Sequence, residues 1–146
     1  MNEEQYSRAN KRVLLAIVVV FGYIAVTLML ALGVSQGGHA SKIMMEAVTA
    51  AAVIVISVAA YLGKRTTRTC AVIMTLSMMI GYFVIVQLNT TVGTWTYGLP
   101  LLIVAMVYLD KKIVMMTNGI ALVAIIVHLV RCFLGGGSDL RNNVIG

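Results

Sequence analysis

Five apolar stretches, separated by short polar breaks, run along the chain and predict an all-α bundle of membrane-spanning helices. The hydrocarbon core of a bilayer is about 30 Å thick, so a helix needs roughly 20 mostly apolar residues to cross it. Four of the stretches have about that length, and the fourth in order is shorter but is still expected to cross. The stretches cover residues 13–34, 43–62, 70–88, 93–109 and 113–134.

Composition supports a membrane protein over a soluble one. The chain is 60% hydrophobic and only 11% charged, whereas soluble domains have about 25% charged residues. Its net charge of +6 does not predict nucleic-acid binding, because the basic residues stand in small clusters beside apolar stretches and form no basic face. We therefore expect the lipid bilayer to be the main partner of the chain.

The basic residues gather at alternate breaks, and this pattern predicts the orientation. The N-terminal tail (residues 1–12) and the second and fourth breaks together hold eight Lys and Arg, whereas the remaining breaks hold three. Because basic residues are retained on the cytoplasmic side, we expect the N-terminus in the cytoplasm of a multi-pass plasma-membrane protein. The eight topology residues are Arg8, Lys11, Arg12, Lys64, Arg65, Arg68, Lys111 and Lys112.

The last twelve or so positions, residues 135–146, are expected to form an outer polar loop. Five crossings place this segment outside the cell, and its sequence turns apolar again at Val144. We expect a sixth helix to follow, so that both ends of the complete protein lie in the cytoplasm.

Three ionisable residues inside apolar stretches are the first candidates for a ligand-sensing site. Glu46, His128 and Arg131 are costly in a membrane, where such groups pair or face a cavity. In one interpretation Arg131 or protonated His128 faces Glu46, and a ligand or a pH change alters the pairing. In a simpler interpretation, which we favour, Arg131 reaches the headgroups, Glu46 pairs with Lys42 and His128 is packed inside the bundle.

Two aromatic residues, Trp95 and Tyr97, stand beside an uncharged outer break that is rich in threonine. Amphipathic rings settle at headgroup depth, so we interpret both residues as interfacial anchors. The alternative makes them part of an outer ligand cleft, in which the threonine hydroxyls supply hydrogen bonds.

The alanine-rich second stretch is expected to lie inside the bundle. Small residues allow helix backbones to approach closely, and two pairs here are four residues apart. These pairs are Ala47 with Ala51 and Ala59 with Gly63.

Other polar groups are expected to serve packing rather than catalysis. Gln87 and Asn118 are predicted to form hydrogen bonds between helices. No nucleotide-binding loop, zinc-protease motif or nucleophile elbow is present, so we predict no enzymatic activity, no catalytic residue and no cofactor or metal.

Four short motifs resemble one family. The sequences RANKR at 8–12, GKRTTR at 63–68, YGLP at 97–100 and MVYLD at 106–110 are similar to the N-terminal membrane sensor region of methyl-accepting chemotaxis proteins. Related regions also precede histidine kinase and diguanylate cyclase modules.

The resemblance implies a six-helix sensory region that relays an outer or membrane stimulus to a cytoplasmic signalling module. It further implies a homodimer formed through the helices, and contact of the cytoplasmic module with a chemotaxis kinase and its adaptor. A small transporter or a subunit of a membrane complex is the competing class.

Overall fold

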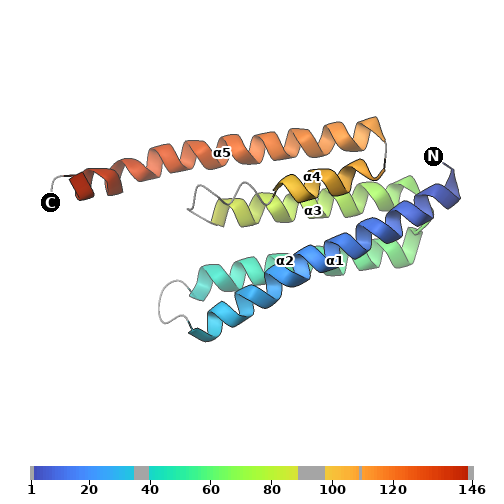
Figure 1. The fold of residues 1–146 in the computed structure, drawn as a ribbon, viewed down its shortest axis with the longest axis horizontal. Helices are drawn as coiled ribbons and strands as arrows, with labels where there is room; N and C mark the ends of the chain where they lie inside the picture. Colours follow the sequence, from blue (N-terminus) through green and yellow to red (C-terminus); the bar gives the residue numbers. More distant parts are fainter. Residues whose placement is uncertain (1, 35–39, 89–97, 109, 145–146) are drawn as a thin grey trace.

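The computed structural model describes residues 2–34, 40–88, 98–108 and 110–144 of the protein. The described part contains five helices and no strand, so the predicted all-α bundle is confirmed (Figure 1). The helices are α1 (Glu3–Val34), α2 (Ala40–Lys64), α3 (Arg68–Leu88), α4 (Gly98–Met106) and α5 (Lys111–Val144). Four of them, α1, α2, α3 and α5, are long and apolar enough to cross a membrane.

Successive helices run in opposite directions. In Figure 1 the start of α1, the α2–α3 turn and the link between α4 and α5 lie at one end of the bundle. The described residues of α3 contact all four other helices, with α1 and α2 on one side and α4 and α5 on the other. This alternation of ends is the one that the sequence predicts from its basic clusters.

The central helix is α3, whereas α2, which the sequence predicts inside the bundle, buries one face and exposes the other. In the most apolar segment of α3, 56% of the residues are buried, whereas in that of α2 28% of the residues are buried. The buried residues of α2 follow one face, at Glu46, Ala47, Ala50, Val53 and Ser57. Because each helical residue turns the chain by about 100°, Ala59 points to the opposite, exposed side.

A glycine explains why α3 can lie so close to its neighbours. At Gly81 an added Cβ would overlap the side chain of Val53 in α2 and would stand 3.3 Å from Cε1 of Phe21 in α1. A larger residue at position 81 would therefore require the neighbouring side chains or helices to shift. One helical turn away from this contact along both helices, the buried hydroxyls of Ser57 and Ser77 lie 3.2 Å apart and join α2 to α3 by a hydrogen bond.

The first helix begins earlier than the apolar pattern indicates. Residues 3–12, expected as a tail, belong to α1, because the start of the helix is capped. The backbone N–H of Gln5 donates to Asn2 Oδ1 at 3.0 Å, and the backbone N–H of Asn2 donates to Gln5 Oε1 at 3.1 Å. This reciprocal capping box satisfies two amides that a helix start leaves unpaired.

Two further segments differ from the expected boundaries. Within the predicted stretch 93–109, whose residues 93–97 and 109 lie outside the described residues, the helix α4 has only nine residues. At 1.5 Å per residue such a helix is about 14 Å long, less than half of a hydrocarbon core. At the other boundary α5 continues as helix to Val144, where the sequence predicts a loop at residues 135–146.

Replacing Gly81 by alanine tests the close contact of α1, α2 and α3. We expect Gly81→Ala to lower the free energy of unfolding by about 1–3 kcal/mol, because the added methyl forces the three helices apart. The same substitution at Gly22 is the matched control, since no atom lies within 4 Å of its added Cβ. Denaturant titration in lipid bicelles measures both variants, and equal stability of the two would contradict the packing.

Candidate functional site

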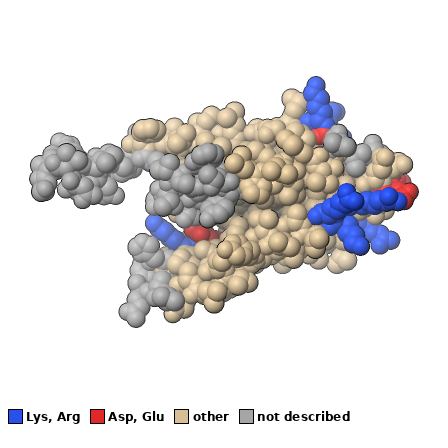
Figure 2. All heavy atoms as spheres, in the orientation of Figure 1, with Lys and Arg blue, Asp and Glu red and all other residues tan. Residues whose placement is uncertain are grey.

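Charged side chains concentrate at the two ends of the bundle and leave its middle uncharged on the face that Figure 2 shows. Figure 2 shows most of the Lys and Arg side chains visible on this face at the end where the N-terminus lies, with a smaller charged group at the opposite end. The order of the helices brings the eight predicted topology residues together at the first of these ends, the basic end. The described spans therefore have the charge distribution that a bilayer requires.

An ion pair at the basic end joins the central helix to the last one. Arg68 Nε donates to Asp110 Oδ2 at 2.8 Å, and the hydroxyl of Tyr6 donates to the same oxygen at 3.4 Å. Asp110 Oδ1 accepts the amide hydrogen of Lys112 at 2.9 Å and so caps the start of α5. The hydrogen bond from Arg68 holds the pKa of Asp110 below its ordinary value. One carboxylate thus connects α1, α3 and α5.

A buried asparagine of α1 forms hydrogen bonds to the neighbouring turn between α2 and α3. Asn10 is fully buried, and its side-chain amide donates to the carbonyl oxygens of Arg65, at 2.8 Å, and Thr67, at 3.3 Å. The hydroxyl of Thr67 donates to the carbonyl of Lys64 at 2.9 Å and accepts the amide of Cys70 at 3.3 Å. The turn is therefore held from α1 on one side and by its own threonine on the other.

Three residues of the basic end, Asn10, Tyr108 and Asp110, are not among the site or packing residues that the sequence predicts. Each lies in one of the motifs that carry the family resemblance, and that is the only signal that singles them out. Tyr108 is fully buried, which shows that this motif contributes to the core of the basic end. Three of the four motifs, at 8–12, 63–68 and 106–110, thus supply residues to one end of the molecule.

At the opposite end, a glutamine connects α3 to α5. The side-chain amide of Gln87 donates to the carbonyl of Ala124 at 3.1 Å, which confirms the predicted hydrogen bond between helices. Arg131 donates from Nη1 to the carbonyl oxygen of Gln87 and to its Oε1, the latter at 3.3 Å. Asn118, by contrast, is exposed on α5. Arg131 is therefore anchored to the end of the central helix.

Two of the predicted sensing residues are buried near this end. His128 is 2% exposed and lies on the α5 face that also buries Ala121 and Ala124. Glu46 is 8% exposed and shares its face of α2 with Ala50. These positions lie on helices that flank α3 from two sides.

The predicted pairing of Glu46 with His128 or Arg131, and the alternative pairing with Lys42, stay predictions. Trp95 and Tyr97 lie outside the described residues, so the outer cleft also stays a prediction. Among the residues that the structure describes, no group of three His, Cys, Asp or Glu side chains could hold a metal ion.

No protein-family model, curated protein or solved structure matches the chain. The resemblance to chemotaxis sensor regions accordingly remains an inference from the four motifs.

The ion pair at the basic end predicts a pH dependence of stability. Because Arg68 lowers the pKa of Asp110 in the folded protein, the pair stabilises the fold above the ordinary carboxyl pKa, and this contribution is lost as the pH falls below about 4. Asp110→Asn should retain the helix cap but remove this part of the acid sensitivity. Thermal unfolding in detergent between about pH 3 and pH 7 measures the effect.

Glu4→Gln is the control for this experiment, because it removes a carboxylate that is 71% exposed and pairs with Arg8 one turn away on the same helix, α1. Its acid sensitivity should match that of the unmodified protein. An Asp110→Asn variant with unchanged acid sensitivity would show that the Arg68–Asp110 pair does not stabilise the bundle.

Proposed function

We propose that the chain is the membrane-embedded sensory region of a receptor of the methyl-accepting chemotaxis class, with its basic end in the cytoplasm. The observation that carries the proposal is the burial of two ionisable residues, Glu46 and His128, in helices on two sides of α3. Ionisable groups within membrane helices are costly, so each of them is a candidate for a functional site. The four motifs that resemble chemotaxis sensor regions support this class of receptor within the proposal.

The central helix is the element through which a stimulus would pass. It is held to α5 at both ends, by Gln87 with Arg131 at one end and by Arg68 with Asp110 at the other. Over its 21 residues, α3 extends about 30 Å, the thickness of the hydrocarbon core. A change in charge or ligation near His128 would alter the packing of α3 against α5, and the basic end would adopt a new position.

Such a switch needs two arrangements of the helices and a stimulus that favours one of them. The two polar connections at the ends of α3 suit this role, because a hydrogen bond weakens steeply when its geometry changes and is therefore either made or broken. In this proposal a second copy of the chain pairs with the first through exposed apolar helix faces. A cytoplasmic module then acts on a kinase and its adaptor, or has kinase or cyclase activity itself.

Neutral substitutions of the two buried ionisable residues test the proposal. In cells that express the reading frame containing this chain, Glu46→Gln and His128→Asn should each change basal kinase output by about fivefold or more, the lower end of typical coupling energies. Glu3→Gln, an exposed carboxylate at the basic end, is the matched control and should leave the output unchanged. Phosphotransfer from the kinase measures the output directly.

Unchanged kinase output in both buried variants, with normal amounts of protein in the membrane, would overturn the sensory proposal. A proton leak into liposomes that contain the chain, abolished by the same substitutions, would instead support the transporter class.

A further inference from the structure

A shallow pocket lies over the turn between α2 and α3, at the basic end. It has a volume of about 480 Å³ and is lined by residues 61–67 and Thr69. We propose that this pocket binds the phosphate of an anionic phospholipid headgroup. This inference goes beyond the proposed function and does not depend on it.

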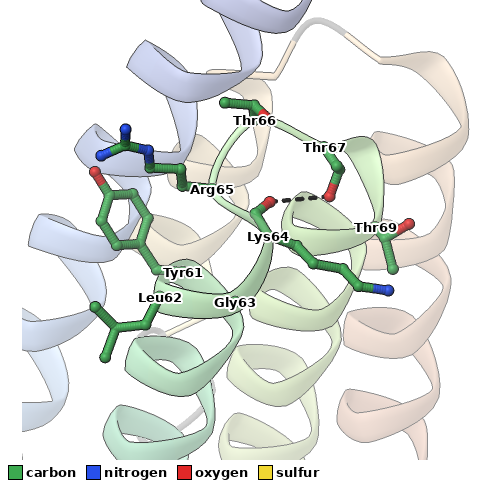
Figure 3. A pocket seen from close by; sticks show the side chains of 8 residues that line it. All are labelled: Tyr61, Leu62, Gly63, Lys64, Arg65, Thr66, Thr67 and Thr69. Carbon is green, nitrogen blue, oxygen red and sulfur yellow. Dashed lines mark hydrogen bonds between the residues drawn. The ribbon is translucent and has the colours of Figure 1, made fainter.

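The lining of the pocket has the chemistry that a phosphodiester requires. Lys64 and Arg65 supply two cations, and Thr66, Thr69 and Tyr61 supply hydroxyl groups. Figure 3 shows Arg65 and Tyr61 on one side of the turn and Lys64 with Thr69 on the other. Phosphate oxygens accept charge-assisted hydrogen bonds from both kinds of cation, and hydroxyl groups can donate to the remaining oxygens.

The backbone of the turn is fixed before any ligand arrives. Asn10 holds the carbonyl oxygens of Arg65 and Thr67, and the Thr67 hydroxyl holds that of Lys64. These hydrogen bonds use main-chain oxygens of Lys64 and Arg65, whose side chains are exposed. A preorganised backbone lowers the entropic cost of binding, since mainly the two long side chains still have to be ordered.

The surroundings of the pocket favour a lipid over a soluble phosphate. Leu62 lines the pocket and is 78% exposed, and Val55 and Ile56 continue an exposed apolar surface along α2 toward the middle of the span. A headgroup bound at the turn would place its acyl chains along this surface. The other basic residues at the same end add to the attraction for an anionic leaflet.

Charge removal inside and outside the pocket tests the site. The whole chain in detergent is titrated with phosphatidylglycerol, with phosphatidylcholine and with inorganic phosphate, and bound lipid is counted by native mass spectrometry. We expect Lys64→Gln and Arg65→Gln each to weaken phosphatidylglycerol binding about tenfold, the effect of losing one hydrogen bond to a charged group at the headgroup phosphate. Lys111→Gln and Lys112→Gln are the matched controls at the same end and should change binding much less.

A steric variant tests the pocket without changing its charge. Gly63 lines the pocket, and no atom lies within 4 Å of a Cβ added there. Gly63→Leu should therefore keep the fold and reduce phosphatidylglycerol binding by filling the pocket. Circular dichroism and the melting temperature confirm that each variant remains folded.

Three outcomes would overturn the proposal. If the pocket variants and the matched controls lose phosphatidylglycerol affinity equally, the lipid is attracted by the overall positive charge of the basic end and not by a specific site. Equal binding of phosphatidylcholine would show that the anionic headgroup is not recognised. Binding of inorganic phosphate as tight as that of the lipid would assign the pocket to a free anion.

Discussion

The hydrocarbon core offers no partner for a polar group, and this constraint determines the arrangement of the whole chain. The described backbone is almost entirely helical, which satisfies its amides and carbonyls internally. Polar side chains within the spans find partners in the protein: Ser57 and Ser77 pair across two helices, whereas Thr75 and Thr117 donate to carbonyl oxygens of their own helices. The charged clusters stay at the ends, and the middle of the bundle is held by close packing at Gly81.

The same constraint makes the ends of α3 the places where the structure can respond to a signal. In the interior, the packing of apolar side chains is insensitive to charge. At the ends, Arg68 with Asp110 and Gln87 with Arg131 connect α3 to α5 through polar groups whose strength depends on charge and water. The sensory proposal and the lipid-binding proposal both place function at these ends, on groups held by a rigid helical framework.

The sequence predicts whatever depends on local pattern and misses what depends on contacts between distant residues. Apolar length located the four long spans α1, α2, α3 and α5, and charge alternation grouped the basic residues, because both follow from the bilayer. The central position of α3 depends on Gly81 meeting Val53 and Phe21, which no periodicity reveals. Asn10 binds main-chain oxygens at the α2–α3 turn, and such contacts leave no trace in side-chain pattern. The capping box at Asn2 and Gln5 was visible in the sequence but lies outside the apolar stretch.

The orientation of the basic end is the central claim, and cysteine labelling in intact cells tests it most directly. In a background of Cys70→Ala and Cys132→Ala, single cysteines are introduced as Thr66→Cys at the basic end and Lys42→Cys at the opposite end. A membrane-impermeant maleimide should label Lys42→Cys in intact cells and Thr66→Cys only after permeabilisation, because the positive-inside rule predicts that the basic end lies in the cytoplasm. Labelling of Thr66→Cys in intact cells would contradict the account.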